Sequence, residues 1–334
     1  MATPLRFRYH PDPWSLGRVK AQLLGDLDRN LGATMSRPWF KLHGPYESRR
    51  FDMDNGDTAL FAWGETGAYW LGNTETPKVL WQTNKMSFAD APEEITAWTE
   101  RELLAELYDD EPWLQSYPAL AQFFLPVLCA KDGREENRRF FREAAAGFPG
   151  TDRDAALSFY ESLLSTRELA DYRHLMAGKL GTSNSFDAHR MAAAMSEFSV
   201  AKLLIDAGYS IEPEAPVTSG HAIDFRVSRN GNGTLVEVTR PSSPDHRNAS
   251  TAVQAIKETV ATKTADQLHH HGGGVTLFVD CSSFDDDAWS HLVATRPEVG
   301  HRPAVIVRIR PGDAITGYTI GGVPLGLDRT ISLL

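Results

Sequence analysis

Apolar and polar residues alternate over residues 49–88, with the period of a β-strand that buries one face. Asn55-Gly56 separates two of these alternating runs, and an Asn-Gly pair in that position is a strong signal for a β-hairpin. The pattern therefore predicts a β-meander. Its strands are expected over residues 51–53, 58–63, 68–71 and 79–82.

The apolar spacing then changes to that of helices, which prolines divide. A polar, glycine-containing stretch at residues 177–185 interrupts this pattern, and we expect a domain boundary there. Residues 1–180 are therefore predicted to form an α+β domain. Its helices are expected over residues 93–108, 114–125, 135–146 and 153–175.

The second part, residues 181–334, has a regular succession of helices and strands. Their order predicts a mixed sheet with helices packed on it. Helices are expected over residues 187–207, 251–268 and 287–294, and strands over 209–212, 222–227, 234–239, 275–280, 304–309 and 315–320.

Composition limits the class of protein. The 334 residues are enough for two domains, and no apolar run approaches the roughly 18 residues that span a bilayer. The start carries no apolar stretch before a cleavage site, so we expect a cytoplasmic protein without a membrane partner. Cys129 and Cys281 stand far apart, which argues against disulfides and structural zinc.

The charge balance is acidic, with a net charge of −10. This balance fits a salt-adapted archaeal protein as well as one from a GC-rich genome. It does not favour a protein that binds nucleic acid with its whole surface, because such proteins usually carry basic patches. Locally, however, residues 221–263 contain more basic than acidic residues.

Most tryptophans lie in the first part of the chain. Large aromatic residues usually fill cores, so we expect core positions for them, with stacking platforms for bases as the alternative. They are Trp14, Trp39, Trp63, Trp70, Trp81, Trp98 and Trp113.

Candidate chemistry lies on two consecutive strands of the second part. Side chains two apart share a strand face, so Ile223, Phe225 and Val227 are expected together, with Asp224 on the other face. In the next strand, Glu237 likewise lies on the face opposite to that of its apolar neighbours. A glycine-rich turn at residues 231–233 would join the strands into a hairpin and bring Asp224 and Glu237 side by side.

Two carboxylates a few ångströms apart are unfavourable unless a proton or cation lies between them. Carboxylate oxygens are the ligands that Mg²⁺ and Mn²⁺ prefer. Asp224 and Glu237 therefore indicate a site for Mg²⁺ or Mn²⁺.

The flanking helices add polar residues. Glu197 lies on the flank of the first helix, from which its carboxylate is expected to reach the same site. Lys263 and Gln267 continue the apolar stripe of the next helix, so they are expected to face inward.

This order of elements resembles the PD-(D/E)XK nuclease superfamily over residues 187–280. The residues that carry the resemblance are Glu197, Asp224 in AIDFRV, Glu237 in LVEVT, and Lys263 with Gln267 in the following helix. It implies an α/β restriction-endonuclease-like domain with a mixed central sheet over residues 181–334.

The resemblance also implies a chemistry. Asp224, Glu237 and the Val238 carbonyl would bind one or two divalent metal ions, with Glu197 assisting. The implied activity is hydrolysis of nucleic-acid phosphodiesters, in DNA rather than RNA.

Thr239 stands where the superfamily has a lysine, two residues after Glu237, and threonine cannot supply a cationic amine. Lys263 is expected to replace it, with Lys257 as second choice. If the Lys263 amine reaches the carboxylates, the enzyme is favoured. If it points to solvent, an inactive binding or structural module with the same fold is favoured.

Two simpler interpretations stay open. Asp224 and Glu237 can be solvent-facing strand residues paired with Arg226 or Arg240, or the domain can have an unrelated fold with the two carboxylates on opposite faces. Under the nuclease interpretation, we expect Arg226, Arg240 and Arg247 to contact phosphates, because they lie in or after the hairpin strands.

Overall fold

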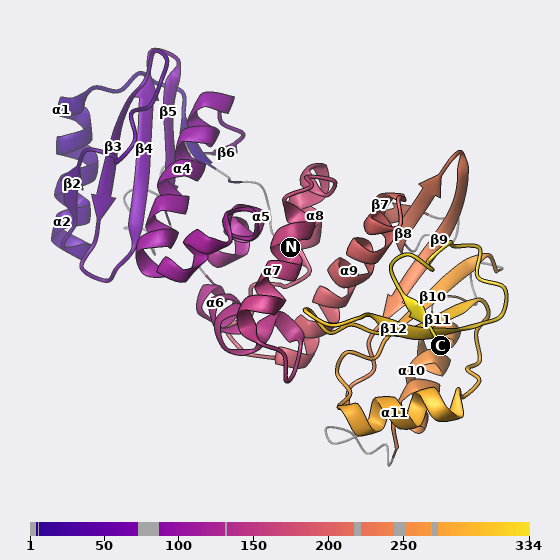
Figure 1. The fold of residues 1–334 in the computed structure, drawn as a ribbon. Coiled ribbons are helices and arrows are strands. Elements are labelled where there is room, and N and C mark those ends of the chain that lie inside the picture. The colour runs from indigo at the N-terminus through magenta and orange to yellow at the C-terminus, as the bar shows by residue number, and fades with distance from the viewer. Residues whose placement is uncertain are drawn as a thin grey trace.

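The computed structural model has two β-sheets, one in each half of the chain, joined by a group of helices (Figure 1). It describes residues 5, 7–72, 87–130, 132–216, 222–243, 251–266, 268 and 273–334. The chain therefore has the predicted layout, with an α+β first part and a second part in which helices pack on a mixed sheet.

The first sheet is antiparallel. It contains β1 (Phe7–His10), β2 (Thr34–Ser36), β3 (Glu47–Asp52), β4 (Thr58–Gly64), β5 (Gly67–Gly72) and β6 (Ser87–Ala89). The order across it is β2-β3-β4-β5-β1-β6. The predicted meander corresponds to β3, β4 and β5, while the strand expected over residues 79–82 lies outside the described residues. β1, β2 and β6 were not predicted.

Helices cover both faces of this sheet, which explains why β4 is buried along its middle. On one face lie α1 (Leu16–Val19), the π-helical turn η1 (Lys20–Leu24) and α2 (Gly25–Leu31), and on the other lies α4 (Glu93–Asp110). Trp63 and Trp70 pack toward α1 and α2, whereas Trp98 of α4 packs on the opposite face. The predicted core positions of these three tryptophans are confirmed, whereas that of Trp39 is wrong because its side chain is exposed, and Trp81 lies outside the described residues.

The connecting helices differ in detail from the prediction. The helix expected over residues 153–175 ends at Leu164, and Arg167 has a left-handed φ of 63°. Pro126 lies inside α5, where a helix end was expected. The elements are η2 (Pro112–Ser116), α5 (Pro118–Leu128), α6 (Arg134–Glu143), η3 (Ala145–Gly147), α7 (Arg153–Leu164), η4 (Ala170–Tyr172) and α8 (Arg173–Gly178).

The second sheet is mixed, as predicted. It follows α9 (Ala188–Asp206) and contains β7 (Ser210–Pro216), β8 (Ala222–Arg229), β9 (Asn232–Thr239), β10 (Val275–Asp280), β11 (Ala304–Arg308), β12 (Thr316–Ile320) and β13 (Ser332–Leu333). The order runs from β13 to β7 in reverse sequence order. β9, β10 and β11 are parallel neighbours, whereas β7, β8 and β9 are antiparallel.

Helices cover the two faces of the second sheet differently. α9 packs on one face, together with helices from the first part of the chain. α10 (Ala252–Asp266) and α11 (Asp286–Thr295) pack on the other face. Alternation in β10 follows this division, because Phe278 packs toward α9 while Leu277 and Val279 pack toward α10 and α11.

The apolar packing crosses the boundary expected after residue 180. One core cluster runs from Leu107 to Ile331, and Leu180 itself is fully buried in it. Asn137 donates a hydrogen bond to the Gly181 carbonyl at 3.0 Å. The segment expected to form the domain boundary is therefore packed against the helices. Among the helices that the structure describes, none has the length and apolar surface to cross a bilayer.

Candidate functional site

The β8–β9 hairpin carries the two central carboxylates. Asn230 and Gly231 form its turn, with φ of 54° and 81°. Left-handed backbone at both positions is typical of a type I′ turn, so the turn lies one residue earlier than the predicted 231–233. The register pairs Arg226 with Leu235, and its continuation sets Asp224 opposite Glu237.

Each carboxylate also binds the backbone of the other strand. The Asp224 amide donates to Glu237 Oε2 at 3.1 Å, and the Val238 amide donates to Asp224 Oδ2 at 2.8 Å. These bonds fix both carboxyl groups where the regular strand pairing stops. Glu237 is only 2% exposed, and charged-group burial of this kind requires such partners.

Ile223 and Phe225 pack on opposite sides of the sheet, so the face assignment from strict alternation is wrong at this point. Ile223 packs in the cluster under α10 and α11, whereas Phe225 packs in the cluster on the α9 side. Asp224 and Glu237 nevertheless lie next to each other, because the charges of Glu237 and Lys263 both act on Asp224. Asp224 also lies near Lys179, which follows α8, while Glu237 pairs with Lys263 of α10.

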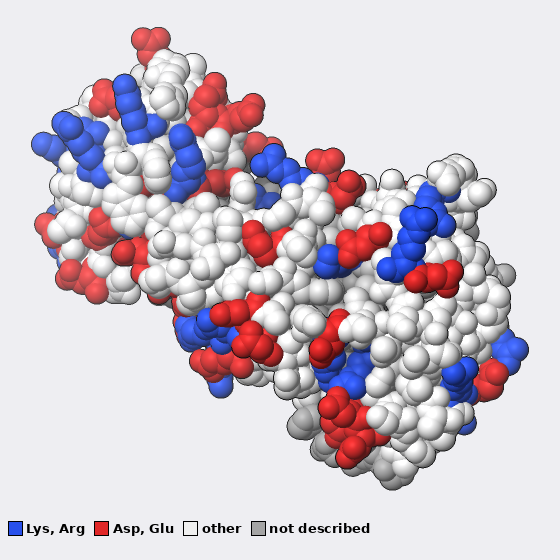
Figure 2. Space-filling view, in the orientation of Figure 1, with Lys and Arg blue, Asp and Glu red and all other residues white. Residues whose placement is uncertain are grey.

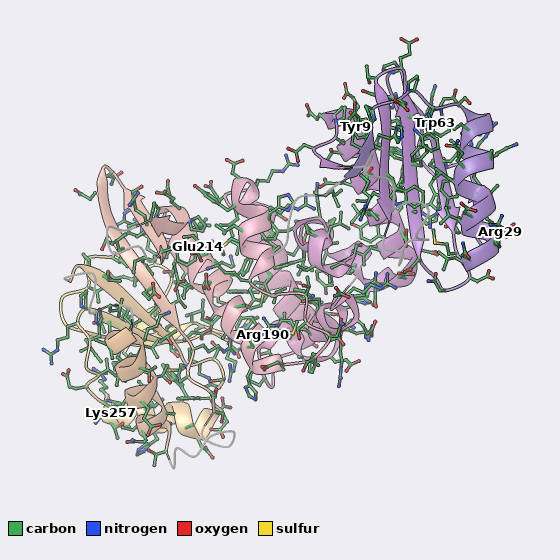
Figure 3. The ribbon with its side chains drawn as sticks, turned by 180° about the vertical axis from the view of Figure 1, so that it is seen from behind. Tyr9, Arg29, Trp63, Arg190, Glu214 and Lys257 are labelled. Carbon is green, nitrogen blue, oxygen red and sulfur yellow. The ribbon has the colours of Figure 1, made fainter. Side chains whose placement is uncertain are left out.

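Lys263 reaches the site from α10. Its ammonium lies 2.6 Å from Glu237 Oε1, and its side chain is 22% exposed. The helical spacing that predicted an inward-facing lysine is thus matched by a direct ion pair. Lys257 is exposed on the same helix (Figure 3).

Glu197 of α9 lies on the other side of Asp224, next to two residues that the sequence did not suggest. The ammonium of Lys179, just after α8, lies 2.5 Å from Glu197 Oε2 and 3.8 Å from Asp224 Oδ1. It also contacts Glu214 Oε1 of β7. Figure 3 labels Glu214 beside the strands of the second sheet.

Glu214 has an unusual backbone for a strand residue. Its φ is 53°, in the left-handed region that favours glycine. Pro213 and Ala215 on either side pair with β8 in a constant register. Residues held in such conformations gather at functional sites. The signal in the sequence was weak: Glu214 stands between two prolines, and Lys179 lies in the stretch expected to form the domain boundary.

The pKa values reflect the crowding of carboxylates. Burial, followed by repulsion from Asp224, raises the pKa of Glu197 to about 8. Burial, followed by repulsion from Glu237, raises the pKa of Asp224 to about 6. Burial alone would lower the pKa of Lys179, but its carboxylate partners outweigh burial and raise it. The group therefore favours an additional proton or cation.

Three carboxylates of this group lie close enough to one another to hold a metal ion. One carboxylate oxygen from each of Glu197, Glu214 and Asp224 lies within 4.8 Å of the others. Hard oxygen ligands of this kind suit Mg²⁺ or Mn²⁺. The Lys179 ammonium already lies among these oxygens and would compete with the ion. The three carboxylates therefore fit a divalent ion only when the Lys179 ammonium moves out from among them.

The three arginines expected to contact phosphates differ in where they lie. Arg226 is exposed and paired with Glu212 at 3.1 Å, so it can still meet a polymer. The predicted phosphate contact of Arg240 is corrected by the structure, because its side chain is only 4% exposed and pairs with the fully buried Asp280 at 3.2 Å. Arg247 lies outside the described residues, as does Gln267.

Arg240 holds parts of the fold together. It donates to the Ala192 carbonyl of α9 at 3.4 Å and to the Gly147 carbonyl of η3. A buried guanidinium with these partners connects the helices to the second sheet.

No curated protein and no solved structure matches the chain. One family model matches residues 2–327, nearly the whole chain. The chain therefore belongs to that family, which is described as a family of unknown function, DUF5784.

Proposed function

We propose that this protein is a divalent-metal-dependent nuclease that hydrolyses nucleic-acid phosphodiesters. The observation that carries the proposal is the ion pair of 2.6 Å between Lys263 and Glu237, next to Asp224. It supplies a cationic amine at the carboxylate pair, although Thr239 stands where the resemblance would place lysine.

The carboxylates suggest where a metal ion would be held. Asp224 is shared between two groups, one with Glu237 and the predicted Val238 carbonyl, the other with Glu197 and Glu214. When bound, Mg²⁺ or Mn²⁺ would polarise the scissile phosphate and lower the pKa of an attacking water molecule.

The chain's own residues would orient the reacting groups. Glu237 is held by the Asp224 amide and by Lys263, so its carboxylate has little freedom. The partly exposed Lys263 ammonium can donate to a phosphate oxygen and stabilise the negative charge that builds up during hydrolysis. DNA is the proposed substrate over RNA, and cytoplasm the proposed location.

The test is cleavage of supercoiled plasmid, linear duplex, single-stranded DNA and RNA with Mg²⁺ or Mn²⁺, at low and high KCl. We expect wild type to cleave at least one substrate and Glu237→Gln to lose that activity. The matched control is Glu212→Gln, which removes an exposed carboxylate of the same sheet. Equal cleavage by wild type and Glu237→Gln would contradict the assignment.

A second candidate comes from Lys179. Because its ammonium lies among Glu197, Glu214 and Asp224, the group can be a permanent internal ion-pair network in a binding module without catalysis. In that case neither Mg²⁺ nor Mn²⁺ raises the melting temperature of wild type, and wild type cleaves none of the four substrates.

A further inference from the structure

Two large aromatic side chains are exposed between β2 and β3. Trp39 is 51% exposed and Phe40 is 38% exposed. The other large apolar side chains exposed in the described ranges are leucines. Trp63, Trp70 and Trp98, by contrast, are buried. An adjacent pair of exposed aromatic residues is unusual, because exposing this surface to water is unfavourable.

The backbone of this pair is fixed by a buried carboxylate. Glu102 of α4 is fully buried and accepts the Trp39 amide at 3.2 Å and the Phe40 amide at 2.6 Å. The Trp98 indole donates to the Phe40 carbonyl at 3.0 Å. Burying a carboxylate is costly, and here it holds two rings outward. The pair is therefore arranged before any partner binds, which reduces the entropy lost on binding.

Two guanidinium groups lie near the two rings, although Arg50 is largely buried and its charge is compensated by Asp52 and Glu106. The Arg50 guanidinium lies 4.4 Å from the Trp39 ring centre, and that of Arg101 lies 5.7 Å from the Phe40 ring centre. Arg37 and Lys41, two residues before and two residues after Trp39 in the sequence, are also exposed. Residues 36–46 contain no acidic residue, although the whole chain, whose charged side chains are shown on one face in Figure 2, has a net charge of −10.

We propose that residues 36–46, the aromatic loop, bind single-stranded nucleic acid. Bases stack on Trp39 and Phe40, and Arg37 and Lys41 contact the phosphates. Stacking suits a single strand because its bases are free to leave one another, and every base offers a flat face. Phosphate contacts make such binding weaken with salt.

The aromatic loop belongs to the first sheet, while the carboxylates lie by the second sheet at the other end of the molecule (Figure 1). The loop would therefore act as a separate anchor for a strand. The choice of nucleic acid as polymer rests on the proposed nuclease function.

The test uses the full chain with Glu237→Gln and no divalent ion, so that cleavage cannot interfere. Fluorescence anisotropy measures binding of labelled oligothymidine at low and high KCl. We expect Trp39→Ala to weaken binding roughly 5- to 150-fold, the range of one base stack. Trp39→Phe should retain most of the affinity.

The matched control is Leu175→Ala, which shortens another exposed apolar side chain, 38% exposed as Phe40 is, in α8. It should leave binding unchanged. Melting temperatures check that all variants are folded. Binding by Trp39→Ala equal to that of the parent, or no binding by the parent at low KCl, would overturn the proposal and point to a protein partner.

The outcome is separable from that of the nuclease proposal. If Trp39→Ala loses oligothymidine binding while wild type cleaves nothing, the aromatic loop stands and the nuclease fails. If wild type cleaves and Trp39→Ala binds normally, the loop proposal alone fails.

Discussion

At the scale of single residues, Lys179 determines the charge of the carboxylate group. It neutralises part of the charge of Glu197, Glu214 and Asp224 from one position. Removing one partner of a largely buried ionic group leaves the others uncompensated, which usually costs more than the pair contributed.

Lys179→Met should therefore lower the free energy of unfolding by about 3 kcal/mol at pH 8 without metal. Mn²⁺ should restore part of this loss, because it would replace the missing cation. Urea unfolding with and without Mn²⁺ measures both effects. Lys202→Met, which removes the helix pair with Asp206, is the control and should cost less than about 0.5 kcal/mol. Equal losses in the two variants would contradict this account.

A pH dependence follows from Glu197. Its pKa is raised from the usual 4.5 to about 8, so the folded protein binds the proton more tightly than the unfolded chain. Between these two pH values the folded state holds more protons, and the contribution of this group to stability falls as pH rises.

Glu197→Gln removes this dependence. Relative to wild type, the variant should therefore gain stability steadily from about pH 5 to pH 8. Urea unfolding of both proteins across this range measures the difference. A difference that does not change with pH would show that Glu197 is not the group that titrates.

At the scale of elements, the sequence predicted what local patterns control. Strand alternation and helix spacing identified Asp224, Glu237 and Lys263, because each signal lies within a hairpin or a single helix. Lys179 and Glu214 could not be found this way, since their approach depends on how α8 and β7 pack. Arg240 was misplaced because its position just after β9 predicted an exposed loop, and local patterns do not show that η3 and α9 pack against it.

The left-handed backbone of Glu214 in β7 gives an element-scale prediction. Glu214→Ala and Glu214→Gly both remove the carboxylate, so they differ mainly in backbone strain. Glycine usually weakens a strand relative to alanine. Here Glu214→Gly should be more stable than Glu214→Ala by about 1 kcal/mol, because the φ of residue 214 is 53°, which glycine adopts without strain. The comparison needs only urea unfolding, and a more stable Glu214→Ala would refute the strain.

At the scale of the whole molecule, Arg240 links three parts of the fold. It binds η3 through Gly147, α9 through Ala192 and β10 through Asp280. The continuous core that runs across the expected domain boundary agrees with this linking role. Residues far apart in sequence therefore meet in one packed unit, which local patterns do not predict.

Arg240→Ala should accordingly lower the free energy of unfolding by about 3 to 5 kcal/mol, since it leaves Asp280 buried and unpaired. Arg226→Ala, on the exposed side of β8, should cost no more than about 1 kcal/mol. Thermal unfolding of the two variants measures this difference. A small effect of Arg240→Ala would restore it as a candidate phosphate contact.

The most direct measurement of the central claim is metal-dependent cleavage by two lysine variants of α10. Lys263→Ala removes the amine that binds Glu237, and Lys257→Ala removes an exposed amine from the same helix. With Mg²⁺ and a labelled DNA that wild type cleaves, Lys263→Ala should be slower by about 10²- to 10³-fold, and Lys257→Ala should match wild type. Equal rates for all three proteins would contradict the proposed site.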